Sequence, residues 1–104
     1  MTTISLKYSN TQGKRPNPAN LALGELAINT VEATGSTALY FKDSSGGLVK
    51  VGPPAYQETA PNATPPSGGY AGNSFGELWI NSISNSMKIY TGTTWACLLY
   101  TSDA

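Results

Sequence analysis

The stretch Gly24-Glu25-Leu26-Ala27-Ile28-Asn29-Thr30 returns 52 residues later as Gly76-Glu77-Leu78-Trp79-Ile80-Asn81-Ser82. Each copy leads through a polar loop into a short alternating run, Leu39-Tyr40-Phe41-Lys42 in the first and Met87-Lys88-Ile89-Tyr90 in the second. Alternation of this kind is typical of β-strands with one buried face. The chain therefore encodes a hairpin twice, and the repeated positions are turn and packing residues rather than a catalytic motif.

The alternation also predicts which side chains pack. In the first copy Leu26 and Ile28 share one face of their strand, and the return strand adds two more apolar side chains to that face. The second copy repeats the pattern. The expected packing residues are Leu26, Ile28, Leu39, Phe41, Leu78, Ile80, Met87, Ile89 and Trp95.

Three further strands are expected beside the hairpins. Residues 4–8 alternate so that Ile4, Leu6 and Tyr8 share a face, and residues 48–51 continue the first unit as a third strand. The last run, 95–100, is apolar on both faces and predicts a strand buried on both sides. Cys97 within it is interpreted as a small buried hydrophobe.

Proline and glycine divide the chain into three parts. Residues 1–52 form the first β-meander unit, 53–75 a Pro/Gly-rich linker without a packed element, and 76–104 the second β-meander unit. An earlier Gly- and Pro-containing stretch, 9–20, predicts an extended surface connection whose Lys14-Arg15 pair is solvated. The predicted fold class is all-β: two small antiparallel meander or hairpin units, fibre-like or sandwich-like when oligomerised.

Composition excludes most chemistry. Lysine plus arginine equals aspartate plus glutamate at six each, so no field attracts nucleic acid or an anionic membrane. Histidine is absent and there is one cysteine, which rules out a zinc cluster, a Ser-His-Asp triad and an intrachain disulfide. No apolar run is long enough for a membrane span, and no signal peptide is expected at the start. We expect no enzyme activity, no cofactor and no metal.

The repeated carboxylates Glu25 and Glu77 could suggest a glycoside hydrolase. Each occupies the same local position in its own copy, however, so a shared structural role, such as a bond to nearby backbone, explains the repetition better. The chain is also small for a stable monomer, because four apolar side chains per unit release less free energy than ordering the unit costs. A homo-oligomer is therefore expected.

Several strings together resemble the recurring unit of tail-fibre and related virion proteins of tailed bacteriophages, notably those of marine and cyanobacterial phages. They are Ser5 to Tyr8, Gly13-Lys14, Leu21 to Thr30, Leu39 to Asp43 and Gly47 to Val51. A second unit found in the same proteins is similar to Thr59 to Pro61, Pro65 to Gly68, Gly76 to Asn81, Met87 to Tyr90 and Gly92 to Trp95. The turn 82–86 departs from that unit, where an Asp-Gly turn is commoner.

The resemblance implies an oligomeric part of a virion, with a trimer favoured, in contact with other virion proteins and able to recognise a host. The motif favours a tail-fibre-like or other appendage protein, whereas the short length favours a capsid (head) decoration or cement protein. We favour the first slightly. A carbohydrate-binding module is the alternative from another class.

Trp79 is the sharpest candidate for contacts outside the unit, because it stands where the first copy has only Ala27. Lys88 and Tyr90 are expected to lie across from it, and Tyr40 of the first copy is also expected to make contacts beyond its unit. Such an aromatic platform beside a lysine would serve as a subunit interface or stack on a host-surface glycan. Interface packing, glycan contact and plain exposure all remain open for Trp79.

Overall fold

The computed structural model of the chain describes residues 7–33 and 36–97. Its strands are β1 Lys7–Ser9, β2 Ala27–Asn29, β3 Ala38–Lys42, β4 Leu48–Val51, β5 Ala55–Gln57, β6 Leu78–Asn81, β7 Met87–Tyr90 and β8 Trp95–Cys97. One short 3-10 helix, η1 Pro18–Asn20, lies between β1 and β2. The all-β prediction is confirmed for the described ranges. Within them, no helix has the length and apolar character needed to cross a membrane.

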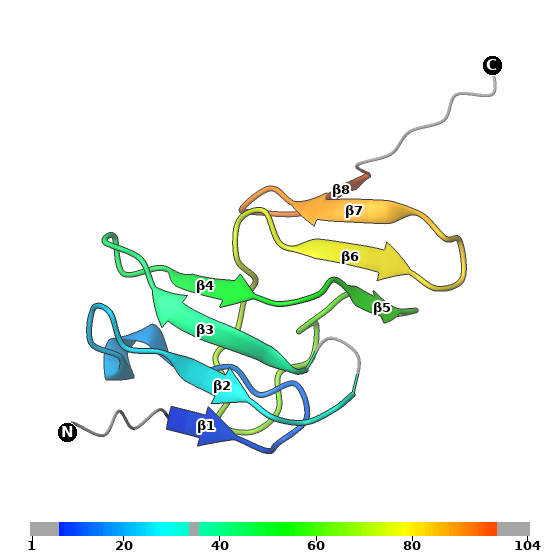
Figure 1. The fold of residues 1–104 in the computed structure, drawn as a ribbon. Helices are drawn as coiled ribbons and strands as arrows, with labels where there is room; N and C mark the ends of the chain where they lie inside the picture. The colour runs from blue at the N-terminus through cyan, green and yellow to red at the C-terminus, as the bar shows by residue number, and fades with distance from the viewer. Residues whose placement is uncertain (1–6, 34–35, 98–104) are drawn as a thin grey trace.

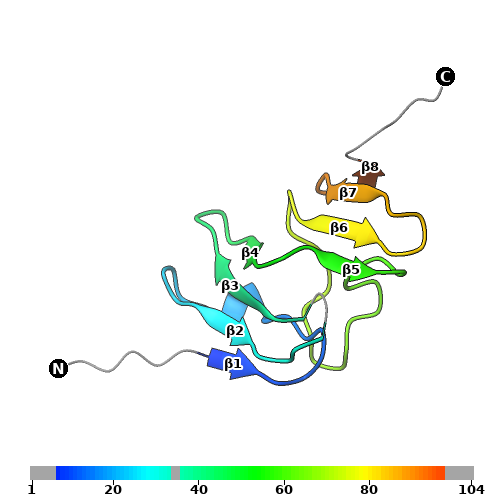
Figure 2. The same cartoon turned by 45° about the vertical axis from the view of Figure 1, so that its right-hand side comes forward.

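The strands form two sheets of four, in the orders β1-β2-β3-β4 and β5-β6-β7-β8 (Figure 1). Each sheet opens with a parallel pair, β1 with β2 or β5 with β6, and continues with two antiparallel pairs. Figure 2 shows from a second side that the chain passes from β4 into β5 and so joins the two sheets. The prediction of two small β units is confirmed. The duplication extends to one strand more per unit than the repeated motif indicates.

The extra strand of the second unit corrects an expectation about the linker. The predicted linker 53–75 contains β5, and Ala55 in that strand is fully buried. Farther along, Pro61 and Ser74 are buried as well. The Tyr70 N–H donates to the carbonyl of Arg15 over 2.9 Å. The segment is therefore packed, despite its proline content, because its hydrogen-bonding groups find partners in both units.

The repeated Gly-Glu pair forms the same turn in both copies. The Glu25 N–H donates to the Ala22 carbonyl and the Glu77 N–H to the Ser74 carbonyl, each over 3.0 Å. Each glutamate carboxylate also accepts from the N–H at the start of its turn, over 2.9 Å at Ala22 and 3.0 Å at Ser74. The shared structural role expected for the two glutamates is confirmed.

The repeated asparagines start the loops that follow. The Asn29 side chain accepts from the Val31 N–H, and the Asn81 side chain accepts from the N–H groups of Ile83 and Ser84. Such bonds turn the backbone away from the strand. The resembled unit more often has an Asp-Gly turn at the position of the loop 82–86. In this chain Asn85 of that loop adopts a left-handed φ of 57°.

In the first sheet, the face predicted to be exposed is buried, and the face predicted to pack is the more exposed one. The side chains that share a face with Ala27 and Tyr40 are the buried ones, with Tyr40 only 1% exposed, whereas Leu26 and Leu39 are 36% exposed. Ile28 and Phe41 are half-buried. The predicted packing face is therefore the more open one. We call the face of Tyr40 the inner face of the first sheet and the face of Leu39 its outer face.

The connection between β1 and β2 explains why the buried face of the first sheet is the opposite of the predicted one. This segment, expected to be a solvated surface loop, lies over the inner face: Leu21 packs with Ala27, Ala38 and Tyr40 in one buried cluster. The buried Asn29 amide donates to the carbonyls of Thr11 and Lys14, 2.9 Å each. Small and polar side chains suit this face because backbone covers it closely.

Two further expectations, which concern the first and last strands, are corrected by the structure. Tyr8 is 74% exposed, and its predicted companions Ile4 and Leu6 lie outside the described residues. In β8 Cys97 is exposed, so its interpretation as a buried hydrophobe is wrong, and Trp95 is half-buried. The remainder of the predicted strand, 98–100, lies outside the described residues.

Candidate functional site

The outer faces of both sheets carry only apolar and aromatic side chains. The strand register places the residues of one face of each sheet beside one another. In the first sheet this outer face is that of Leu39, and in the second sheet we call the face of Ile80 the outer face. The first set is Tyr8, Ile28, Leu39, Phe41, Val49 and Val51, and the second is Tyr56, Leu78, Ile80, Met87, Ile89 and Ala96. All are half-buried or exposed, with Val51 at 48% and Tyr56 at 53%.

A soluble monomer seldom exposes a contiguous face of this kind. Side chains at partial exposure gain further free energy only when something covers them. The two outer faces are thus the candidate assembly surface. Two of its positions carry the same residue in both copies, Ile28 with its counterpart Ile80 and Tyr8 with Tyr56.

Trp79, the strongest candidate from the sequence, is 6% exposed. It lies on the face of the second sheet opposite Ile80, which we call the inner face of that sheet. Its indole N–H donates to the Gln57 carbonyl over 2.9 Å. The ring makes an edge contact with Trp95, with centroids 5.4 Å apart, and the Lys88 Nζ lies 5.1 Å from the ring centroid. The expected placement of Lys88 across from Trp79 is confirmed by the strand register.

The other two candidates differ in position. Tyr90 makes an edge contact with Trp95 at 5.2 Å and so belongs to the same aromatic group as Trp79. Tyr40 is in the other sheet, with the Arg15 guanidinium 5.9 Å from its ring centroid. Burial raises the pKa of Tyr40. Trp79 and Tyr40 offer almost no surface to a partner in the single chain, and their interface or glycan role stays a prediction.

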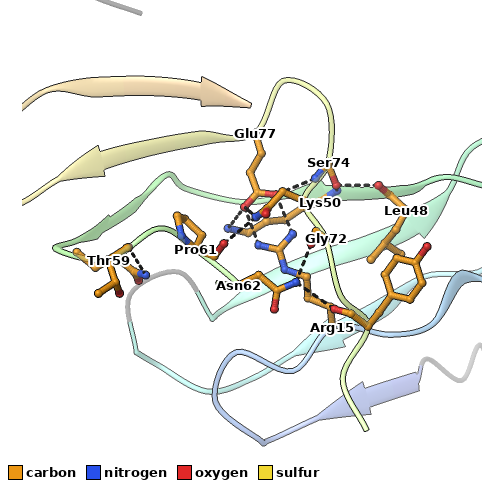
Figure 3. A network of polar contacts seen from close by, with 12 residues as sticks. Arg15, Leu48, Lys50, Thr59, Pro61, Asn62, Gly72, Ser74 and Glu77 are labelled. Carbon is orange, nitrogen blue, oxygen red and sulfur yellow. Dashed lines mark hydrogen bonds and ion pairs between the residues drawn. The ribbon is translucent and has the colours of Figure 1, made fainter. Parts of the chain in front are cut away.

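An ion cluster between the two sheets was not expected from the sequence. The Glu77 carboxylate receives two hydrogen bonds from the Arg15 guanidinium, at 2.7 and 2.6 Å, and the Lys50 Nζ is 3.9 Å away (Figure 3). The three side chains are only 2–3% exposed. Bidentate geometry makes the Arg15 contact the strong one. We call Arg15, Lys50 and Glu77 the ion cluster.

The members of the ion cluster shift one another's pKa values. Burial alone would raise the pKa of Glu77, but the hydrogen bonds and charge of Arg15, the Ser74 N–H and the charge of Lys50 outweigh it, so that pKa is lowered. Burial lowers the pKa of Lys50 although Glu77 opposes this. For Arg15 burial acts downward, and the bond and charge of Glu77 prevail and raise the pKa. The guanidinium and the carboxylate are therefore both charged at neutral pH.

The cluster ties residues of one unit to the other. Arg15 comes from the connection that covers the first sheet, Lys50 from β4, and Glu77 from the turn before β6. Ser74 reinforces the tie, since its hydroxyl donates to the Leu48 carbonyl and accepts from the Lys50 N–H. The expectation that Arg15 is solvated is wrong. The repeat identifies Glu77 as structural, but nothing in the sequence indicates which cation it meets.

The matching glutamate of the first copy has a different environment. Glu25 is 3.5 Å from Lys7, and their side chains are 27% and 53% exposed. Its pKa is lowered mainly by the hydrogen bond from the Ala22 N–H. Neither glutamate takes part in a metal-ligating group, because the described ranges contain no cluster of three or more His, Cys, Asp or Glu residues able to hold an ion.

Comparisons with protein-family models, with curated proteins and with solved structures found no match.

Proposed function

We propose that this chain is a structural component of a tailed-phage virion: a small tail-fibre-like or other appendage protein that assembles with copies of itself and contributes to attachment at the host surface. The observation that carries the proposal is the pair of apolar outer faces, which every strand of both sheets helps to form. The resemblance of the repeated strings to phage tail-fibre units supplies the virion context.

The electrostatics support assembly through these faces. Twelve charged side chains in a chain of net charge zero produce little repulsion between copies. The outer faces carry none of them, so that two faces meet without burying an unpaired charge. A trimer is the favoured assembly because the resembled proteins are often trimeric. The work is mechanical or recognitive rather than catalytic, since both repeated carboxylates are engaged in their turns.

Sedimentation of the purified chain at micromolar concentration tests the assembly. We expect a mass three times the 10.9 kDa of one chain. Val51→Lys places a charge on the outer face at a position that is 48% exposed, so it should dissociate the oligomer and leave the monomer folded. Leu23→Lys, at an exposed turn position away from the outer face, is the matched control. A wild-type monomer that melts cooperatively would refute the proposal.

Immunogold labelling of intact particles tests the location. Label confined to the tail is expected for an appendage protein. Label over the whole head would instead identify a capsid decoration protein, and particles without label would place the chain outside the virion.

A further inference from the structure

A cleft of about 590 Å³ opens between the two units at the free edge of β4. One wall is the end of the first sheet from Asp43 to Val49, and the other is the segment 70–75 with Tyr90 and Gly92. Its volume falls in the range of sites for small molecules. This cleft contains none of Trp79, Lys88 and Tyr40, so it is distinct from most of the group singled out by the sequence.

Aromatic rings line the cleft where the fold makes little use of them. Phe75 occupies the second position of the Ser74–Glu77 turn and is 81% exposed, and Tyr70 is 37% exposed. A Cβ at Gly92 would meet the Phe75 ring at 3.6 Å, which places this ring beside the mouth of the cleft. The first copy has Leu23 at the matching turn position. An exposed ring at a tight turn presents a flat apolar surface to a ligand.

Polar groups also line this cleft, among them those of Asp43. The Asp43 Oδ1 accepts from the N–H groups of Ser45 and Gly47 at 2.9 and 2.8 Å, which fixes the carboxylate. Both of these bonds end on Oδ1, so Oδ2 keeps its acceptor capacity.

The backbone adds a donor. Because Asp43 bonds to Gly47 and the antiparallel pattern alternates, the Leu48 N–H points to the free edge of β4, beside the Leu48 carbonyl held by Ser74 (Figure 3). The residues that line the cleft therefore include a backbone donor, Leu48, and an acceptor held by its turn, Asp43.

The charged groups that line the cleft indicate which class of ligand it can bind. Arg15 also lines the cleft, but its guanidinium is 2% exposed and committed to Glu77, so it cannot serve a phosphate, sulfate or carboxylate. The exposed Asp43 carboxylate would repel an anion. A ligand that offers an apolar face to the rings and hydroxyl groups to a carboxylate is an uncharged sugar.

We propose that this cleft binds a neutral saccharide of one or two rings. The apolar face of the sugar stacks on Phe75 and Tyr70, one hydroxyl donates to the Asp43 Oδ2, and another accepts from the Leu48 N–H. As the host contact of a virion component this site rests on the proposed function, but binding by the purified chain is independent of where the chain resides.

Saturation-transfer NMR with lactose, cellobiose, mannobiose and diacetylchitobiose tests the site. At least one disaccharide should give a response, and Phe75→Ala should weaken its binding roughly three- to tenfold, as expected for loss of one stacking ring. Asp43→Asn should also weaken it, because the amide keeps the Oδ1 acceptor for the turn and replaces Oδ2. Leu23→Ala, the matching change in the first copy, should leave binding unchanged.

The outcomes separate the site from the proposed function. No response from any of the four sugars, or a response that Phe75→Ala leaves intact in a folded variant, overturns the saccharide site. Tighter binding of sialyllactose than of lactose, or binding of choline alone, overturns the neutral class. Sugar binding by a chain that does not label virions would leave the site standing and refute the virion role.

Discussion

The two units share a backbone and differ in what their inner faces hold. In the first, Ala27 and Tyr40 pack under a loop, whereas in the second the equivalent strand pair carries Trp79 opposite Lys88. The glutamates at the matching turns differ in the same sense, since Glu25 is partly exposed and Glu77 is enclosed. The shared Gly-Glu pair thus forms the same turn in both copies, whereas the inner faces differ at positions such as Ala27 and Trp79.

Both units keep an apolar outer face although most of its residues differ between the copies. The interior of the first unit depends on the connection between β1 and β2 that covers it, and this connection differs in sequence from the one between β5 and β6 up to the shared Gly-Glu pair. Among the described residues, the side chains of the outer faces stay half-buried or exposed, and their apolar character is kept at Ile28 and Ile80 alike. The apolar character of both outer faces fits a common partner, which in the proposed assembly is another copy of the chain.

The largest expected effect is at the position where the interiors differ most. Trp79→Ala gives the second unit the alanine of the first, but without a loop shaped to fill the space. Loss of the buried ring should lower the free energy of unfolding by about 3–5 kcal/mol, measured by urea denaturation. Trp79→Phe, which keeps a ring and loses the bond to the Gln57 carbonyl, should cost much less. A small loss for the alanine variant would mean that the second unit does not depend on its own interior.

Glu77→Gln and Glu25→Gln compare the two repeated carboxylates. Neutralising Glu77 leaves Arg15 and Lys50 buried with no negative charge, which should cost on the order of 3 kcal/mol in urea denaturation. The same change at Glu25 should have little effect, because glutamine still accepts the turn bond and the Lys7 contact is exposed. Equal losses in the two variants would show that the turn, and not the ion cluster, accounts for the role of Glu77.

Acid provides a reversible form of the same comparison. The folded-state pKa of Glu77 is below its ordinary value of 4.5, so its stabilising contribution is complete above that value and is lost as the pH falls through the folded pKa. The free energy of unfolding should therefore stay nearly constant from neutral pH to about 5 and decrease below about 4.5. Glu77→Gln should flatten this decrease more than Glu25→Gln. A pH dependence that the Glu77 variant retains in full would contradict the assignment.

The strands of both hairpins were predictable, because alternation and turn residues act locally. The paired strands β2–β3 and β6–β7 lie where the runs around Leu39 and Ile89 place them. The alternation over 4–8 predicted a strand that overlaps β1, but neither its parallel pairing with β2 nor the strand β5 was predicted, since a parallel partner comes from a distant segment. For β5 the surrounding prolines also favoured a linker.

The burial of the faces could not be predicted from the sequence. Alternation shows that Leu39 and Tyr40 point to opposite sides, but it does not show which side a loop will cover. Here the covering segment contains Leu21 and Arg15, and it selects the face with Ala27 and Ala38 because small side chains allow backbone to approach. The cleft beside Phe75 was equally hidden, because its walls come from both units.

The smallest expected effect tests whether the turns themselves are equivalent. Gly24 and Gly76 adopt left-handed φ values of 85° and 87°, and a Cβ on either would meet nothing within 4 Å. Alanine at each position should therefore cost only backbone strain, about 1 kcal/mol in urea denaturation, and asparagine less because it tolerates this conformation.

Equal losses for Gly24→Ala and Gly76→Ala would support two independent turns that share a geometry. A larger loss at Gly76 would have a specific meaning. The Glu77 carboxylate both accepts from the Ser74 N–H across this turn and holds Arg15, so a small shift of the turn would also misalign the bidentate pair. Gly76→Ala in the Glu77→Gln background distinguishes the two cases, because the excess over the Gly24 variant should vanish once the ion cluster is neutralised.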